Sequence, residues 1–303
     1  MKYGIINRIY EKVYNLRCHK VIGAGVLYNL LLKFCDPIIK TRINNQDCFV
    51  HFSHQGVYYI NVFPDYDRNI GRICSYLKKT LGRQISIVDI GANVGDTILC
   101  IGDKSYKYYA VEGEKRYYSL LKYNLREYDY ELIKSYLGDK DELQNCSIDY
   151  SNGTGAILTN VKDNQMEIKK ADSIFLDKPF IDFVKIDTDG YDFSVIRGMK
   201  ELIKSFRPVV YFEWTAPELI NNNEDLVSVF SLFDEWNYEK CLIFDKYGNF
   251  MCSQNISNIS LLKQLINYSL KADIYYDVCV FPTEMKIDIK YLINAFQKKG
   301  HVQ

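Results

Sequence analysis

Acidic residues follow several apolar segments of this chain, in an arrangement that could bind a small ligand. Asp89 lies in "ISIVDI", and four further acids end later apolar segments: Glu112, Asp139, Asp187 and Glu213. If these segments are parallel strands, their carboxyl ends meet at one edge of a sheet, where open α/β folds bind ligands. A cleft lined by carboxylates attracts a positively charged ligand.

The turn after the first acid contains two glycines. In "VDIGANVGDT", Gly91 and Gly95 would let backbone amides approach a ligand closely. Glu112 follows about 20 residues later, where a carboxylate can accept both hydroxyls of a ribose. A dinucleotide would place its pyrophosphate at the start of the next helix, but Asp96 stands there and would repel it. S-adenosylmethionine (SAM) has a ribose, a cationic sulfonium and no phosphate, so we favour SAM over NAD.

A second glycine pair, in "VIGAGVLYN", is a rival for the binding loop. It lies in a helical N-terminal region, Tyr28 occupies the sixth motif position, and no acid-ended strand follows at the required distance. We therefore expect Gly23 and Gly25 to permit close helix packing instead.

The order of apolar segments indicates an α/β fold. Residues 1–40 look helical, and "CFVHFS" and "VYYINVF" flank His54-Gln-Gly as a predicted hairpin. From "ISIVDI" onward, strands such as "KYYAVE", "ELIKSYLGD", "IDFVKID" and "RPVVYFEW" alternate with helical patterns. Nearly continuous apolar strands indicate a mainly parallel sheet that is covered on both faces. We divide the chain into an N-terminal helical and hairpin extension (1–84), the sheet domain (85–285) and a helical tail (286–303).

The composition excludes some classes of function. Lys and Arg number 38, as do Asp and Glu, so no basic surface for nucleic acid is indicated. The nine cysteines include no CxxC, which argues against a disulfide framework or zinc site and favours a reducing compartment. The apolar run Val21–Cys35 contains Asn29 and Lys33 and is too short to span a bilayer. We expect a cytoplasmic protein without stable membrane insertion; peripheral contact of the N-terminal helices with a membrane is a minor alternative.

Blocks of sequence in a fixed order resemble the FkbM family of SAM-dependent methyltransferases. They are "VDIGANVGDT", "YYAVEGEKRYYSLLKYNL", "LGD", "FVKIDTDGYDFSVIRGM" and "RPVVYFEW", within roughly residues 85–282. The resemblance implies a Rossmann-like class I methyltransferase fold with a mainly parallel seven-stranded sheet. It also implies O-methylation of a hydroxyl on a small or carbohydrate acceptor, such as a glycan or a sugar-containing metabolite.

The resemblance also implies roles for the residues that match. The methionine part of SAM would lie at the turn formed by Gly91, Asn93 and Gly95. Asp89 would stabilise both this turn and the amino group of SAM. Glu112 would bind the ribose, Asp139 the adenine amino group, and Asp187 would lie near the methyl group. Two positions depart from the family: Asp189 replaces a frequent Glu, and Gly113 replaces a frequent Pro.

Methyl transfer to a hydroxyl needs a base within hydrogen-bond reach of the acceptor. We expect Asp187 to be this base, with Asp189 second and Glu213 third. Helix capping explains Asp189 equally well, and it is the better explanation for Asp192.

The same three carboxylates could bind Mg²⁺ or Ca²⁺, although we do not favour a metal. His51 and His54 form an HxxH pair, but residues three apart on a strand face opposite sides, so a shared metal is not expected. We expect these histidines at the surface or at the hairpin tip.

Two other functions remain open. A nicotinamide-linked oxidoreductase would bind NAD in place of SAM, and a non-catalytic module would keep the fold and dock to a partner. The oligomeric state is not indicated.

Overall fold

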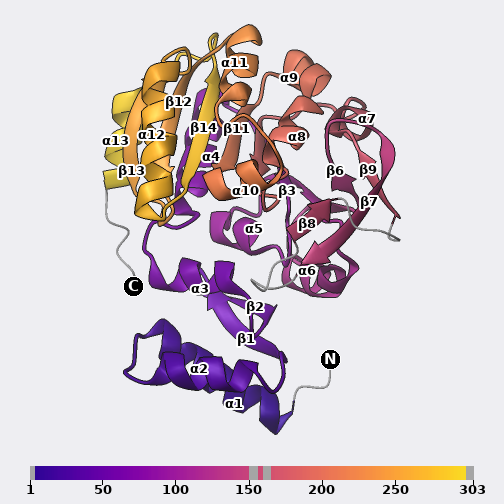
Figure 1. The fold of residues 1–303 in the computed structure, drawn as a ribbon, viewed down its shortest axis with the longest axis vertical. Coiled ribbons are helices and arrows are strands. Elements are labelled where there is room, and N and C mark those ends of the chain that lie inside the picture. The colour runs from indigo at the N-terminus through magenta and orange to yellow at the C-terminus, as the bar shows by residue number, and fades with distance from the viewer. Residues whose placement is uncertain (1–3, 150–155, 160–164, 298–303) are drawn as a thin grey trace.

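The computed structural model describes residues 4–149, 156–159 and 165–297, and its centre is an eight-stranded sheet (Figure 1). In spatial order the strands are β13 (Phe250–Asn255), β12 (Tyr238–Asp245), β14 (Tyr276–Pro282), β11 (Val209–Trp214), β10 (Phe183–Ile186), β3 (Ser86–Ile90), β4 (Lys107–Val111) and β5 (Tyr130–Ile133). The strands from β11 to β5 are parallel, and β14, β12 and β13 are antiparallel to their neighbours. The α/β class is confirmed. The sheet has one strand more than the expected seven, because β13 returns along the edge beside β12.

The two faces of the sheet are covered by different helices. Every residue of β3 is buried, and alternate side chains enter separate apolar clusters, Ile87 on one face and Val88 on the other. One cluster includes α4 (Arg68–Leu81), α5 (Asp96–Ile101), the short η1 (Lys115–Tyr117), α6 (Tyr118–Asn124) and α13 (Ile289–Gln297). The other includes α7 (Ala171–Phe175), α8 (Asp192–Arg197), α9 (Lys200–Phe206), α10 (Ala216–Asn221), α11 (Ser228–Glu235) and α12 (Ile259–Ala272). This burial on both faces explains the continuous apolar runs in the sequence.

The N-terminal part consists of α1 (Ile5–Cys18), α2 (Ala24–Leu32), a hairpin of β1 (Ile38–Ile43) and β2 (Gln46–His51), and α3 (Gln55–Val62). The predicted hairpin around His54 is wrong. The hairpin turns at Asn44 and Asn45, whose φ angles of 48° and 62° suit a two-residue turn. The following residues form α3, because Val57 and Ile60, spaced as on one face of a helix, are both buried.

The segment "ELIKSYLGD" is not one strand. β5 ends at Ile133, and a second short strand, β6 (Tyr136–Leu137), leaves the main sheet and pairs with β9 (Gln165–Lys169). β6 and β9 belong to a four-stranded sheet that also contains β7 (Glu142–Asp149) and β8 (Ala156–Thr159). Figure 1 shows this small sheet beside the main one. The hairpin predicted around "SNGTGAIL" corresponds to β7 and β8, and its turn lies outside the described residues.

The N-terminal part is joined to the main sheet by a continuous core. One apolar cluster contains Tyr14 and Phe52 of the extension together with Phe244 and Phe296 near the other end of the chain. The Asn69 side chain donates a hydrogen bond to the Gly248 carbonyl, which ties the start of α4 to the turn between β12 and β13. Among the described helices, none is long and apolar enough to cross a membrane.

Candidate cofactor and acceptor site

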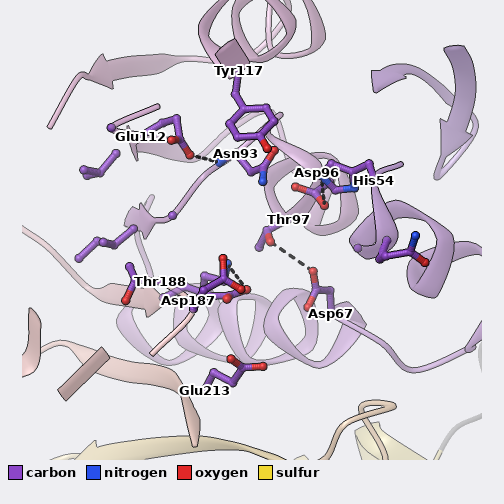
Figure 2. A pocket seen from close by; sticks show the side chains of 18 of the residues that line it. His54, Asp67, Asn93, Asp96, Thr97, Glu112, Tyr117, Asp187, Thr188 and Glu213 are labelled. Atoms are coloured by element: carbon purple, nitrogen blue, oxygen red, sulfur yellow. Dashed lines mark hydrogen bonds and ion pairs between the residues drawn. The ribbon is translucent and has the colours of Figure 1, made fainter. Parts of the chain in front are cut away.

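A cavity of about 400 Å³ lies at the carboxyl ends of the central parallel strands. Gly91 follows β3, Glu112 follows β4, Asp187 follows β10, and Glu213 is near the end of β11; all four line the cavity. The chain runs outward from β3 through β4 to β5 and then crosses to β10 on the other side of β3. This reversal of strand order is the position at which open α/β sheets bind ligands. Figure 2 shows the labelled carboxylates around the space.

The glycines after β3 are required by the packing of the protein itself. A Cβ on Gly91, whose φ is 81°, would lie 1.8 Å from the Asp187 carbonyl oxygen. A Cβ on Gly95, whose φ is 83°, would lie 2.9 Å from Cγ of Leu125. The Gly91 and Gly95 amides already donate to the carbonyls of Val111 and Ala92. The turn therefore lines the cavity with Gly91 and Asn93, whereas Gly95 is not part of the lining.

Glu112 and Asn93 are linked by backbone hydrogen bonds. The backbone N–H of Asn93 donates to Glu112 Oε2 at 2.8 Å, and the backbone N–H of Glu114 donates to Glu112 Oε1 at 2.6 Å. Burial raises the pKa of Glu112 to about 7, although these two hydrogen bonds act in the opposite direction. The Asn93 Oδ1 atom is buried and accepts no hydrogen bond from any described residue. Each Glu112 oxygen can accept one more hydrogen bond, so both side chains retain acceptors that a ligand could use.

A buried lysine connects two of the predicted acids. Lys185 of β10 places Nζ 3.0 Å from Asp187 Oδ2 and 3.6 Å from Asp89 Oδ1. Asp89 is 1% exposed and does not line the cavity, whereas Asp187 and Lys185 do. Burial raises the pKa of Asp89 to about 6, and the ammonium of Lys185 opposes this shift. Lys185 was not predicted, although a lysine within the otherwise apolar "FVKI" was a signal for it.

The N-terminal extension supplies one wall of the cavity. His54 at the start of α3, Tyr59 within it and Asp67 before α4 all line the space. The Asp67 carboxylate accepts a hydrogen bond from Thr97 Oγ1 at 3.2 Å, and burial raises its pKa to about 7. Figure 2 shows His54 and Asp67 on the side opposite Glu112.

His54 corrects the expectation of a surface histidine. It is 1% exposed, and its Nδ1 accepts a hydrogen bond from the Val57 amide at 3.3 Å. The neutral ring therefore carries its proton on Nε2, which lies 3.9 Å from Asp96 Oδ2. His51 is half-buried and lies outside the cavity lining.

Asp139, like Asp89, is not among the residues that line the cavity. Its carboxylate lies 3.6 Å from Arg197 Nε, and its amide donates to Ser194 Oγ. The reason is the departure of β6 from the main sheet, which carries the following residues into the small sheet. In its place Tyr136 lines the cavity, and its ring lies so close to Gly113 that a Cβ there would be 2.3 Å from Cδ1.

Asp189 and Glu213 both line the cavity, whereas Asp192 supports the turn beside it. Asp192 accepts hydrogen bonds from the Thr188 backbone amide and hydroxyl at 3.3 and 3.0 Å. It is the first residue of α8, whose N-cap is Tyr191 and which has no side-chain cap hydrogen bond, so the expected helix capping by Asp189 or Asp192 is wrong. Asp189 has a φ of 49° and lies in the tight turn between β10 and α8.

The rival glycines Gly23 and Gly25 lie outside the cavity lining. A Cβ on either would meet nothing within 4 Å, so the expected close helix packing is wrong. Gly23 instead has a φ of 81° immediately before α2, a conformation that favours glycine.

Carboxyl groups dominate the ionisable side chains that line the cavity. One lysine, Lys185, lines it, against seven carboxylates: Asp67, Asp96, Glu112, Asp187, Asp189, Glu213 and Glu218. Within the described part of the chain, no group of three or more His, Cys, Asp or Glu side chains is arranged to hold a metal ion. The geometry fits an organic cation with hydroxyl groups.

Comparison with protein families gives one decisive match. The model of the methyltransferase FkbM domain matches residues 89–240, half of the chain. The chain belongs to the FkbM methyltransferase family. The matched segment begins at Asp89 and ends inside β12, so His54 and Asp67, which line the cavity, lie outside the matched segment. Comparison with curated proteins gives no match.

Several solved structures resemble this FkbM family member. A methyltransferase FkbM from Methylobacillus flagellatus KT is 16% identical over 52% of this chain and 40% of its own length, with a TM-score of 0.38. The plantazolicin methyltransferase BpumL in complex with SAH is 11% identical over 71% of this chain and 83% of its own, with a TM-score of 0.38. The bifunctional kinase-methyltransferase WbdD is 10% identical over 71% of this chain and 38% of its own, with a TM-score of 0.42.

Proposed function

We propose that this protein binds SAM at the carboxyl ends of β3, β4 and β10 and methylates a hydroxyl of a neutral small-molecule or carbohydrate acceptor. The observation that carries the proposal is the carboxylate-lined cavity at the strand-order reversal of an FkbM domain. The excess of carboxylates favours a cationic cofactor and disfavours an acceptor that carries phosphate or carboxylate groups near the reacting hydroxyl.

The residues on the β4 side suit the nucleoside. Glu112 would accept the ribose hydroxyls with its remaining lone pairs, and the Tyr136 ring beside Gly113 offers a surface for the adenine. The free acceptor on Asn93 suits the amino group of the methionine part. Asp89 would act from behind the cavity through Lys185. We assign no cofactor contact to Asp139, which is paired with Arg197.

The residues on the β10 and β11 side suit the acceptor. When bound, SAM supplies a methyl group on a cationic sulfur, and the acceptor oxygen must lose its proton as it is methylated. Asp187 projects into the cavity with a side chain that is 45% exposed, and Lys185 fixes its orientation. We assign to Asp187 the role of the base that takes this proton, with Asp189 as the second candidate. Burial and the neighbouring Asp187 and Glu218 raise the pKa of Glu213 well above its ordinary value, so Glu213 suits a hydrogen-bond donor better than a base.

Calorimetry and a transfer assay test the proposal. We expect the protein to bind SAM and not NAD, and to transfer a labelled methyl group from SAM to at least one member of a panel of neutral glycans and sugar metabolites. NAD binding without a response to SAM would indicate a nicotinamide-linked oxidoreductase. Binding of SAM with no transfer to any acceptor would instead favour a non-catalytic module.

The affinity for SAM should depend on pH through Glu112. Its pKa of about 7 in the free protein means that it is largely protonated at pH 6, and a cation and hydroxyl donors favour its ionised form. SAM binding should therefore strengthen from pH 6 to pH 8, by at most about tenfold per pH unit for one proton. The Glu112→Gln variant should bind SAM about 10–100-fold more weakly, because hydrogen bonds to a charged group contribute about 1.5–3 kcal/mol.

Isothermal titration over this pH range measures both effects. Asp67 has a similar pKa of about 7, so Asp67→Asn is the matched control and should keep the pH dependence that arises from Glu112. An unchanged pH profile in Glu112→Gln would contradict the assignment of Glu112 to the ribose.

Other parts of the interpretation are also proposals. The eight cysteines whose side chains the structure describes are free thiols, which favours a cytoplasmic location. The balanced charge of the chain argues against nucleic acid as a partner. We retain the division into residues 1–84, 85–285 and 286–303 as a family domain with two additions, although the shared core indicates that they fold together.

A further inference from the structure

Helices α1 and α2 form an N-terminal helical hairpin, which exposes a stripe of large apolar side chains. Ile22, Val26, Leu30 and Phe34 are spaced four residues apart in and around α2, and their exposed fractions are 101%, 75%, 51% and 75%. Val26 and Leu30 lie on one side of α2, Ile22 precedes the helix, and Phe34 follows its last residue, Leu32. Ile5, Ile6 and Ile9 of the adjoining α1 are also more than half exposed. Monomeric soluble proteins rarely expose so many large apolar side chains in one region.

The stripe is held outward by the packing of the opposite side of the hairpin. Tyr28 of α2 is buried, its ring centroid lies 4.5 Å from that of Phe52, and its hydroxyl donates to the Phe52 carbonyl. Tyr10 of α1 packs on the same phenylalanine at 4.8 Å and donates a hydrogen bond to the Leu31 carbonyl. These contacts fix which side of α2 faces the protein. The exposed stripe is therefore a property of the folded structure, and Figure 1 shows the hairpin at the far end of the molecule from the main sheet.

The hairpin is also basic, although the whole chain is neutral. Residues 4–35 contain five Lys and Arg and one acidic residue, Glu11, a formal excess of four positive charges. Arg17 is engaged with the rings of Tyr28 and Tyr58 at 3.9 and 3.7 Å. Lys20 and Lys33 are exposed and adjoin the two ends of the apolar stripe.

We propose that this hairpin docks the protein on an anionic membrane surface. The stripe would enter the boundary between headgroups and acyl chains, and Lys20 and Lys33 would contact anionic headgroups. A second copy of the chain is a less favourable partner for the apolar stripe, because pairing two helical hairpins would bring their positive charges together. The proposal does not depend on the identity of the methyl acceptor.

Vesicle flotation with the full chain tests the proposal. The protein should float with vesicles of equal parts phosphatidylglycerol and phosphatidylcholine, and much less with phosphatidylcholine alone or at high salt. The variant Ile22→Ser/Val26→Ser/Phe34→Ser should lose binding by about tenfold or more. The variant Lys20→Gln/Lys33→Gln should lose about 30-fold, because each lysine near an anionic surface contributes about fivefold.

A matched control removes exposed apolar residues elsewhere. Tyr268 and Leu270 of α12 are 58% and 44% exposed, and Tyr268→Ser/Leu270→Ser should float like the unmodified protein. All variants should keep their melting temperature by circular dichroism, since the replaced side chains are exposed. Failure of the unmodified protein to float, or equal flotation of the stripe variant, would overturn the proposal. The proposal would also be overturned if the protein did not bind vesicles but sedimented as a dimer, and if the Ile22→Ser/Val26→Ser/Phe34→Ser variant sedimented as a monomer. That result would assign the surface to self-association.

Discussion

Replacement of Asp187 by asparagine is expected to lower the turnover of methyl transfer by about 10²–10⁴-fold, the usual contribution of a general base. Asparagine keeps the shape of the side chain but cannot take the acceptor proton. SAM binding should fall much less, because Glu112, Asn93 and the strand-end turn remain. Single-turnover transfer and calorimetry on the same preparation separate the two effects.

Two neighbouring carboxylates serve as controls for this assignment. Glu213→Gln and Asp189→Asn alter residues that line the same cavity, and we expect each to reduce turnover less than Asp187→Asn. If Glu213→Gln proves the most damaging of the three, the role of base belongs to Glu213.

Replacement of Lys185 by methionine is expected to lower the free energy of unfolding by about 3–5 kcal/mol, the cost of leaving a buried charge without its partner. Methionine preserves most of the volume of the side chain. However, neither oxygen of the buried Asp89 accepts a hydrogen bond from the described residues, so Lys185 is its main electrostatic partner. Urea unfolding measures the loss.

The pH dependence of the loss in unfolding free energy tests whether Asp89 is its source. The pKa of Asp89 is already raised to about 6 in the folded protein, and removal of the ammonium should raise it further above the unfolded value. The folded variant then binds a proton more readily than the unfolded chain, so its stability increases as pH falls through the folded pKa. The deficit should be large at pH 8 and smaller at pH 5, and Asp89→Asn/Lys185→Met should recover most of it. An equal deficit at both pH values would show that lost packing is responsible.

The sequence predicted the central sheet and most of its acidic edge because both depend on local pattern. Strands buried on both faces read as continuous apolar runs, and the acid after each run occupies a position set by the strand itself. Asp89, Glu112, Asp187 and Glu213 are all found at the carboxyl ends of neighbouring strands for this reason.

Asp139 and His54 show where this reasoning fails. The run "ELIKSYL" has a strand pattern throughout, but the pattern does not reveal that the chain changes sheets between Ile133 and Tyr136. The alternation near His54 suited a strand as well as a helix, and tertiary packing of Val57 and Ile60 decided in favour of α3. The position of Asp67 in the cavity depends on the docking of the extension, which no local pattern encodes.

The cavity is lined both by the family domain and by residues that precede it, and this bears on how related proteins could come to prefer different acceptors. The floor comes from strand ends whose backbone is constrained on every side; at Gly91, for example, no side chain fits beside Asp187. The facing wall, with His54, Tyr59 and Asp67, comes from a helix and a turn that precede the family domain. Exchange or drift of that short stretch could reshape the entrance for a different acceptor while the strand-end residues stay the same.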